Sequence, residues 1–396
     1  MAGPQDTPIR LAFVVSHPIQ YYVPLYQRLA RRNDVDIKVF YTWQADRAPV
    51  FDPGFQQHIA WDIPLTQGYE FEAVSNTSRD PGTHHFFGLT NPGLVEQVLA
   101  WKPHAVHVTG WAWHSHLLAL RRLRAIGVPV LFRGDSHLLD APGSRLRAFV
   151  KRALLRRVFS WPTVFLYTGQ ANKAYFEAFG VPPEKLSYCP HSIDVDRFAR
   201  PAADLESQAR RWRHELGITD EQKVVLFAGK FEPRKRPLEL MKAVLAHTPC
   251  VLIMVGGGEL QPQVESLAAT AASRVRVLGF QNQATMPVVY RMGDVFVLPS
   301  AHGETWGLAV NEALACGRPV VVSDRVGCAA DVIDDSCGRT FPVDGVSDMI
   351  RAVQEIIRDS SREALRRGAT ARSMKFDIAR TETSLLHSLH ALAYAR

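Results

Sequence analysis

The sequence is poor in the features that mark secreted, membrane-spanning and metal-binding proteins. It has five cysteines among 396 residues, an odd and scattered set that favours a reducing compartment over a disulfide framework. No apolar run approaches the roughly 20 residues that a spanning helix needs. The first ten residues do not have a basic start followed by an apolar segment, so we expect no signal peptide and a cytoplasmic location. The patterns C-x-x-C and H-E-x-x-H are missing, so we expect no metal site.

The composition is that of an ordinary globular protein, with 46% apolar and 21% charged residues. The length is sufficient for two domains, each with its own core. A net charge of +7 would allow nucleic acid as a partner, but no basic motif with interleaved aromatic residues accompanies it. We therefore expect no nucleic-acid partner.

Short apolar runs alternate with helical patterns along the chain, which predicts an α/β fold with parallel sheets. The first strand is expected over residues 11–16, and the loop after it reads Ser-His-Pro-Ile-Gln. A nicotinamide-binding fold would place a glycine-rich turn at that point. The missing turn therefore argues against a dehydrogenase.

The most informative stretch is residues 298–333. A strand over 295–298 is followed by a loop that holds Glu304, and a helix is expected from about residue 305, with Glu312 two turns inside it. Gly317 should end this helix. Both carboxylates could then face one crevice, and the free N–H groups at the helix start would favour an anion between them. A bare pair of glutamates at this spacing is more often one helical residue and one solvated loop charge, but here the surroundings favour a site.

This stretch resembles the donor-binding signature of retaining glycosyltransferases of family four, which have the GT-B fold. That signature is E-x7-E followed by G-x-P-V-V-x-S and a downstream Gly-Asp pair. The matching residues here are Glu304, Glu312, Gly317, Pro319, Val320, Val321, Ser323, Gly327 and Asp331. The resemblance implies two Rossmann-like domains facing a cleft: an acceptor-side domain over 1–199, a nucleotide-sugar-binding domain over 200–375, and a helix over 376–396 that returns to the first domain.

The resemblance also implies a basic loop that holds the donor diphosphate, after a strand expected over 223–228. The family pattern there is Gly-Arg-x4-Lys-Gly. Lys235 stands at the lysine position, whereas Lys230 replaces the arginine and loses its bidentate fork. A solvated basic turn is the alternative. The full set of expected donor-binding residues is Gly229, Lys230, Lys235, Gly256, Gly257, Gly279, Phe280, Glu304, Thr305, Trp306, Gly307, Leu308 and Glu312.

The acceptor side is less well defined by the sequence. His17 and Gln20 lie in the loop after the first strand, and Trp111 follows a strand expected over 105–109. Ligands of open α/β sheets bind outside the carboxyl ends of the strands, so these residues are acceptor-side candidates. Related enzymes commonly have a histidine in the region of Asp135, and this chain departs from that pattern. The identity of a catalytic base therefore stays open between Asp135 and His137.

The family resemblance implies transfer of a sugar, with retention at the anomeric carbon, from a UDP-, GDP- or similar nucleotide-diphospho-sugar. The acceptor would be a glycan, a lipid-linked saccharide or a small molecule. Lys235 and Lys230 would stabilise the leaving diphosphate without a metal or other cofactor, Glu304 would orient the donor sugar, and Glu312 would bind the ribose hydroxyls. Sugar-nucleotide epimerases and α-glucan phosphorylases share the fold and remain alternatives, as does a non-enzymatic sugar-binding module.

Residues 144–160 hold six basic residues and no acid. At 100° per residue the apolar side chains Leu146, Phe149, Val150, Ala153 and Leu154 share one face of the expected helix. This pattern is typical of a helix that lies in a membrane interface, which would place the protein peripherally at the inner face of the membrane. A helix that packs its apolar face on its own sheet has the same pattern, so both interpretations stand.

Overall fold

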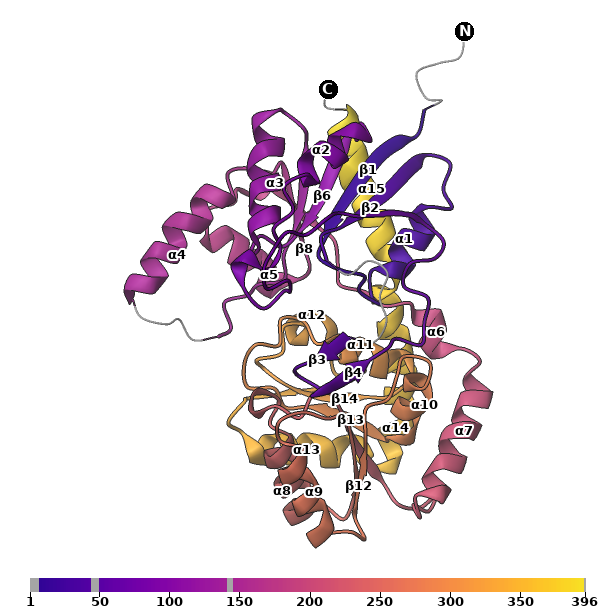
Figure 1. Cartoon of the computed structure of the whole chain (residues 1–396). Coiled ribbons are helices and arrows are strands. Elements are labelled where there is room, and N and C mark those ends of the chain that lie inside the picture. The colour runs from indigo at the N-terminus through magenta and orange to yellow at the C-terminus, as the bar shows by residue number, and fades with distance from the viewer. Residues whose placement is uncertain (1–6, 44–49, 141–144, 395–396) are drawn as a thin grey trace. The chain divides into compact units, whose positions relative to one another are not determined.

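A computed structural model describes residues 7–43, 50–140 and 145–394 of the chain (Figure 1). The chain divides into two compact units, neither of which is continuous in sequence. Unit 1 comprises Met1–Ala48, Pro64–His191 and Ile378–Arg396, and unit 2 comprises Pro49–Ile63 and Ser192–Asp377. The boundaries expected from the sequence place residues 50–63 in the first domain, whereas the structure groups this segment with the second unit.

Unit 1 is built on a parallel seven-stranded sheet of order β5-β2-β1-β6-β7-β8-β9. Its central strands are short apolar runs buried on both faces, as parallel strands covered by helices require. The strands are β1 (Ile9–Val15), β2 (Val35–Tyr41), β5 (Glu70–Ala73), β6 (Ala105–Thr109), β7 (Val130–Arg133), β8 (Val164–Tyr167) and β9 (Leu186–Tyr188).

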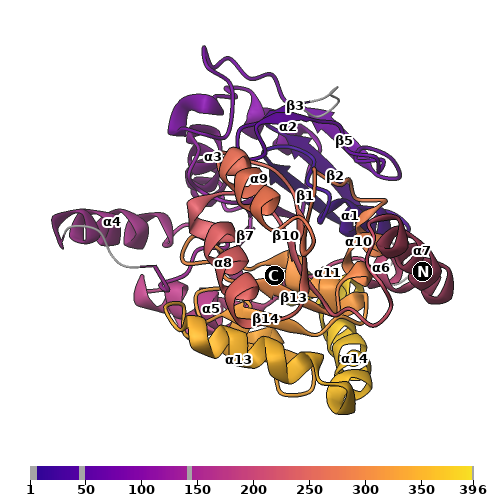
Figure 2. The same ribbon diagram turned by 90° about the horizontal axis from the view of Figure 1, so that it is seen from below.

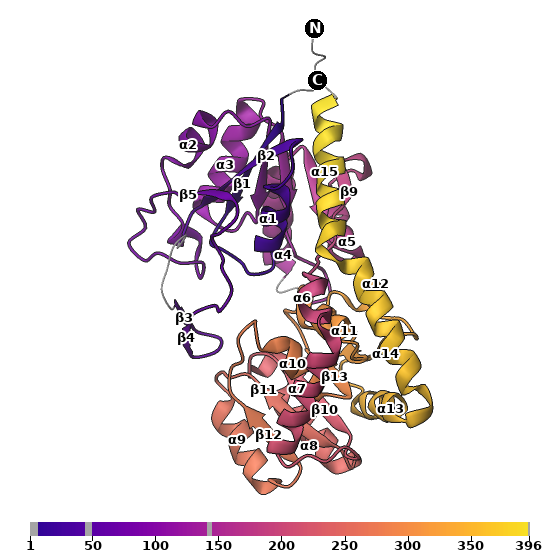
Figure 3. The same ribbon diagram turned by 90° about the vertical axis from the view of Figure 1, so that its right-hand side faces the viewer.

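Helices cover both faces of this sheet, and each face has its own apolar core. The C-terminal helix α15 (Ile378–Tyr394) belongs to one of these cores through Leu385 and Leu389, and Glu382 pairs with Arg28 of α1. Figure 3 shows α15 lying along this sheet beside β9. The remaining helices of unit 1 are α1 (Val23–Leu29), the 3-10 turn η1 (Phe86–Gly88), α2 (Leu94–Ala100), α3 (His114–Ala125), α4 (Arg145–Val158), α5 (Gln170–Ala178) and the 3-10 turn η2 (Pro183–Lys185).

Unit 2 has a parallel six-stranded sheet of order β12-β11-β10-β13-β14-β15. Numbered within the sheet this order is 3-2-1-4-5-6, the arrangement of a doubly wound nucleotide-binding fold. The strands are β10 (Val224–Ala228), β11 (Val251–Val255), β12 (Val275–Leu278), β13 (Val295–Leu298), β14 (Val320–Ser323) and β15 (Gly338–Phe341), with a separate antiparallel hairpin of β3 (Val50–Asp52) and β4 (Gln57–Ile59).

The helices of unit 2 also cover both faces of its sheet. Helices α8, α9 and α13 contribute to one apolar cluster with the sheet residues, and Figure 2 shows these three helices around β10 to β14. The helices are α6 (Val195–Ala199), α7 (Ala202–Glu215), η3 (Pro233–Lys235), α8 (Pro237–His247), α9 (Gln261–Thr270), α10 (Met286–Met292), α11 (Leu308–Ala315), α12 (Ala329–Val332), α13 (Val346–Ile357), α14 (Asp359–Ser373) and η4 (Met374–Phe376).

The expected two-domain α/β architecture with parallel sheets is confirmed. Gly317 ends α11 as expected: its φ is 66°, and the N–H groups of Gly317 and Arg318 close the last turn on Leu314 and Ala313. The expected start of α11 is wrong: the helix begins at Leu308 and not near residue 305. Gly307, with φ 94°, breaks the helical path before it.

Among the described residues, no helix is both long enough and apolar enough to cross a bilayer.

Candidate functional site

The order of the unit 2 sheet marks one edge as the place where a ligand would bind. Strand β10 pairs with β11 on one side and with β13 on the other, so the chain reverses direction along the sheet between β10 and β13. In doubly wound folds the ligand crevice opens at this reversal, outside the carboxyl ends of the strands. The loops that follow β10 and β13 carry the basic turn and Glu304.

These two loops are joined by hydrogen bonds. Ala301 N–H donates to the carbonyl of Arg234 at 2.7 Å, and the Arg234 guanidinium donates to the carbonyl of Gly303 at 3.0 Å. Lys235 then reaches Glu304, with 2.5 Å between Nζ and Oε2. The structure therefore brings together two of the expected site residues, which lie 69 positions apart in the chain.

The Lys235–Glu304 pair is largely withdrawn from water, with both side chains only 13% exposed. Burial pushes the pKa of Glu304 upward, but Lys235, Arg234 and a hydrogen bond from Ser300 outweigh it, and the pKa lies below its usual value. Glu304 is thus an ionised carboxylate whose charge is matched by one lysine. A donor phosphate that approached Lys235 would compete with this carboxylate for the ammonium group.

The loop from Glu304 to Gly307 is fixed by its contact with Gly327. The Gly327 N–H donates to the carbonyl of Glu304 at 3.0 Å, and Cys328 N–H donates to that of Trp306 at 2.9 Å. A Cβ on Gly327 would lie 1.9 Å from the carbonyl oxygen of Thr305, so no larger residue fits. This packing fixes the three residues that lead from Glu304 into the first turn of α11, and first-turn amides have no partners within their own helix.

Glu312 lies inside unit 2, with 2% of its surface exposed. The hydroxyl of Tyr290 on α10 donates to its carboxylate at 2.6 Å. The indole of Trp306 is also buried and donates to Asn311 at 3.0 Å, so the side chain of this expected donor residue is not available to a ligand. Thr305 is exposed and Leu308 is half-buried.

The other lysine, Lys230, is held by a residue that the sequence did not single out. Its Nζ lies 2.9 Å from Oδ1 of Asp52, at the end of β3 in the hairpin. The same oxygen accepts from the N–H groups of Gly54 and Phe55 at 2.8 and 3.1 Å, so it also closes the hairpin turn. Lys230 favours the ionised form, and the pKa of Asp52 is lowered although burial opposes this. No local pattern could reveal this contact, since 178 positions separate the two residues.

The hairpin packs over the remaining expected donor residues. The Phe55 and Phe280 ring centroids lie 5.0 Å apart edge to face, and the Trp61 ring also lies edge to face with Phe280 at 6.2 Å. A Cβ on Gly257 would meet the carbonyl of Phe55 at 3.4 Å, whereas one on Gly279 would meet nothing within 4 Å.

Two further glycines let the strand tips approach one another. A Cβ on Gly256 would lie 2.0 Å from the carbonyl oxygen of Gly229, so the turns after β10 and β11 can touch only without a side chain there. An open pocket of about 520 Å³ adjoins these turns, a volume within the range of small-molecule sites. Its lining combines the hairpin with the loops after β10, β11 and β13: Pro53, Gly54, Gln56, Glu232, Pro233, Arg234, Glu259 and His302.

The expected acceptor-side residues all lie in unit 1, at the carboxyl ends of its strands. His17 bonds Ser16 through Nδ1 at 2.9 Å and contacts the Trp43 ring, and burial lowers its pKa to about 4. His17 is therefore neutral at pH 7. Trp111 is half-buried against the apolar core beside α3, and Gln20 is half-buried in the loop before α1.

Asp135 is a poorer candidate for a base than the sequence suggested. Its Oδ1 lies 3.0 Å from Nε2 of His191, and the buried Arg133 is close by. Burial raises the pKa of Asp135, but His191 and Arg133 more than offset this and hold it at about 2. A carboxylate with so low a pKa accepts a proton weakly at neutral pH. His137 accepts a hydrogen bond from the N–H of Leu139 at 3.2 Å through Nδ1.

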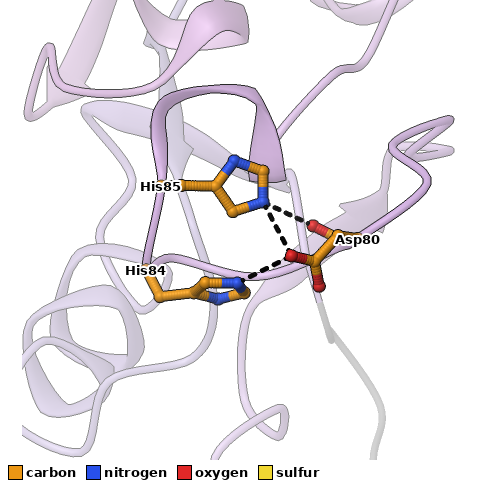
Figure 4. A group of neighbouring side chains, drawn as sticks. All are labelled: Asp80, His84 and His85. Atoms are coloured by element: carbon orange, nitrogen blue, oxygen red, sulfur yellow. Dashed lines mark hydrogen bonds and ion pairs between the residues drawn. The ribbon is translucent and has the colours of Figure 1, made fainter.

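Within the described residues, one group of side chains could hold a metal ion, namely Asp80, His84 and His85 in the loop between β5 and α2 (Figure 4). This group belongs to unit 1 and includes none of the expected donor-binding residues. Its spacing, Asp-x3-His-His, is neither C-x-x-C nor H-E-x-x-H, so the patterns on which we expected no metal site do not include it.

Comparison with known families agrees with this architecture. The family "Glycosyl transferases group 1" matches residues 208–373, within unit 2. The family "Glycosyl transferase 4-like domain" matches residues 68–191, within unit 1.

Relatives with similar sequences include a D-inositol 3-phosphate glycosyltransferase of Xylanimonas cellulosilytica, 32% identical over 50% of this chain and 49% of the relative. A phosphatidyl-myo-inositol mannosyltransferase of Mycolicibacterium smegmatis is 32% identical over 51% of this chain and 49% of its own. The chain thus spans about half the length of the curated relatives it matches.

Solved structures match over nearly the whole chain and show the same fold. Sucrose-phosphate synthase from Thermosynechococcus elongatus has a TM-score of 0.76 at 20% identity, covering 98% of this chain and 100% of its own. Anabaena Alr3699/HepE in complex with UDP-glucose has a TM-score of 0.69 at 17% identity, covering 97% and 100%. With both glycosyltransferase domains matched in order, the chain belongs to family four of the GT-B glycosyltransferases.

Proposed function

We propose that the protein transfers a sugar from a nucleotide-diphospho-sugar to a hydroxyl acceptor, with retention at the anomeric carbon and without a metal ion. This proposal rests on one observation: Lys235, Glu304 and the start of α11 lie together at the ligand edge of the unit 2 sheet. Fixed cations and oriented amides at such an edge suit a leaving diphosphate. The HepE structure with UDP-glucose supports this class of donor.

In the proposed reaction the acceptor oxygen forms a bond to the anomeric carbon while the bond from that carbon to the phosphate oxygen breaks. The leaving phosphate oxygen takes the acceptor proton, so no strong protein base is required. Lys235 and Lys230 neutralise the charge that develops on the diphosphate, and the amides at the start of α11 add oriented dipoles. Glu304 orients the donor sugar, and Glu312 receives the ribose hydroxyls.

A screen of nucleotide sugars tests this proposal. The protein is incubated in excess chelator with UDP- and GDP-sugars and with acceptors that include inositol 3-phosphate, phosphatidylinositol and short glycans. Release of nucleotide diphosphate together with a glycosylated product of unchanged anomeric configuration is expected. An epimerase would instead change the donor sugar without an acceptor, and a sugar-binding module would release no nucleotide. Transfer that stops with chelator and returns with Mn²⁺ or Mg²⁺ would refute metal independence.

The hairpin gives a separate prediction about donor binding. Asp52 and the donor diphosphate would compete for Lys230, so Asp52→Asn is expected to lower the KM for the donor severalfold. The asparagine carbonyl can still accept from Gly54 and Phe55, which keeps the turn closed. Steady-state kinetics at varied donor concentration measure the change. A raised KM would instead mean that Asp52 holds Lys230 in its binding position.

We also propose that α4 contacts an anionic membrane surface. The second half of α4 packs on unit 1 through Leu155 and Val158, whereas Phe149, Val150 and Leu154 are 72%, 57% and 47% exposed. Figure 1 shows the helix extending outward from the other elements of unit 1. Lys151, Arg152, Arg156 and Arg157 are exposed around these apolar residues. Ser144 and the side chains of residues 145–147, which the sequence pattern also included, lie outside the described part.

Binding to vesicles tests this contact. The protein is expected to sediment with phosphatidylglycerol vesicles at low salt and to be released as salt rises, because each basic residue near an anionic leaflet contributes about 1 kcal/mol. Arg152→Glu with Arg156→Glu, or Phe149→Ser, should each weaken sedimentation. Arg121→Glu with Arg124→Glu makes the same charge change at exposed positions of α3 and is the matched control. If the control weakens binding equally, or the wild type ignores anionic vesicles, α4 is not the contact.

A further inference from the structure

The loop between β5 and α2 gathers two imidazoles around one carboxylate. Nε2 of His84 lies 3.0 Å from Oδ2 of Asp80, and Nε2 of His85 lies 3.3 Å from the same oxygen. The three ligand atoms all lie within 4.8 Å of one another. Figure 4 shows both rings turned toward Asp80 from the same stretch of loop. The three residues fall within six positions of the chain, so a single loop conformation sets the whole group.

The loop that carries this group is held by backbone and amide hydrogen bonds. Gly82 N–H donates to the carbonyl of Gly88 at 3.1 Å, and the Asn76 side chain donates to that carbonyl at 2.8 Å. A Cβ on Gly88 would lie 2.1 Å from the carbonyl oxygen of Gly82. Asn76 and Gly88, which flank the three residues in the chain, are thus held together, which lowers the entropy cost of ordering the side chains between them around an ion.

The spacing of the three ligand atoms suits a zinc ion. Zinc binds imidazole nitrogen and carboxylate oxygen at about 2.0–2.1 Å, so neighbouring ligands of a tetrahedral ion lie about 3.3 Å apart. The separations from Asp80 to His84 and to His85 are close to this value. We propose that Asp80, His84 and His85 form a binding site for a divalent transition-metal ion of the zinc type, with solvent in the remaining coordination position.

Binding would exchange hydrogen bonds for coordination bonds. In the structure Nε2 of His84 bonds the Asp80 carboxylate, and Nε2 of His85 lies 2.9 Å from the Asp80 carbonyl oxygen. Both contacts give way when the ring nitrogens turn to the ion. All three side chains are more than one third exposed, so an ion can enter without opening the fold. Two imidazoles favour zinc over Mg²⁺ and Ca²⁺, which prefer oxygen ligands.

The ion would act on the loop and not on the sugar-transfer chemistry. The indole N–H of Trp113 donates to the carbonyl of Thr83 at 3.2 Å, so the metal-holding turn is tied to the segment that leads from β6 into α3. Trp111, an expected acceptor-side residue, lies in that segment. Zinc would therefore stiffen the part of unit 1 that holds the expected acceptor-side residue Trp111. Because the ion takes no part in sugar transfer, activity in excess chelator does not conflict with this metal site.

Calorimetric titration of the full chain with ZnCl₂ tests the proposal. One zinc ion is expected per chain, with affinity lowered at least tenfold by His84→Ala and by His85→Ala. Mg²⁺ and Ca²⁺ should give no comparable binding. Hydrogen exchange of a peptide that spans residues 79–90 should slow when zinc is added to the wild type and stay unchanged in the variants.

The chain holds 15 histidines, so weak binding elsewhere needs a control. His387 is exposed on α15, in the same unit, and His387→Ala should bind zinc as the wild type does. Equal zinc affinity in the wild type and in His84→Ala and His85→Ala would overturn the proposal, as would the absence of any zinc-dependent change in exchange of the loop. Because neither measurement uses a nucleotide sugar, a negative result leaves the proposed transferase function standing.

Discussion

Replacing Lys235 with alanine, or Glu304 with glutamine, is expected to slow sugar transfer about a hundredfold while the protein stays folded. Loss of one group that stabilises transition-state charge costs roughly 3 kcal/mol. The two side chains form a 2.5 Å ion pair at the ligand edge of the unit 2 sheet, so each change also frees its partner. In Lys235→Ala the pKa of Glu304 should rise, because burial pushes it upward and its main counter-charge is gone.

The measurement is turnover at saturating donor, with thermal unfolding as the check on folding. Lys242→Ala is the matched control, since Lys242 is an exposed lysine on the adjoining helix α8. The double variant Lys235→Ala with Glu304→Gln should lose less than the product of the two single losses, because the residues contact each other. Turnover near that of the wild type in either folded single variant would exclude the pair from the transfer step.

The second large effect is expected on donor binding when Glu312 becomes glutamine. A hydrogen bond to a charged group contributes about 1.5–3 kcal/mol, so the KM for the donor should rise roughly 10- to 150-fold. Tyr290→Phe removes the hydroxyl that donates to Glu312 at 2.6 Å but keeps the carboxylate. That variant should show a smaller rise, since it only loosens the position of Glu312.

A donor with a deoxyribose sugar separates binding from a general structural defect. If Glu312 receives the ribose hydroxyls, the wild type should bind the deoxy donor less tightly, whereas Glu312→Gln should lose little more. Equal losses in the wild type and the variant would show that Glu312 supports the fold of α11 and does not contact the ribose.

The strand tips of the candidate site could be predicted because buried parallel strands are short apolar runs. Strands β10 and β13 follow this pattern, and the loop after each begins where the run ends. The start of α11 could not be predicted, since the loop before it is held by hydrogen bonds from Gly327 to Glu304 and from Cys328 to Trp306. The helical pattern of the sequence already begins in this loop, and such a pattern carries no information on hydrogen bonds to residues far away in the chain.

The sequence also could not predict which charged side chains surround each candidate residue. Asp135 was a reasonable base from its place after β7, but its pairing with His191 depends on how β7 and the chain after β9 lie in the sheet. Likewise, Asp52 reaches Lys230 only because the hairpin packs with unit 2. In both cases the sequence locates the residue near a strand end, and the tertiary structure determines its partner.

The place of α15 in unit 1 has a consequence for the order in which the chain folds during synthesis. Ile378, Leu385, Leu386 and Leu389 complete a core whose other buried members lie before residue 190. At 5–20 residues per second the ribosome needs on the order of 10 to 40 s to make the intervening Ser192–Asp377. The segments of unit 2, hairpin included, are therefore all synthesised before unit 1 can close its last core. Unit 1, whose first segment is made first, is therefore completed last, and until then α1 alone among the described helices covers the core that α15 later joins, so apolar residues of this core stay exposed.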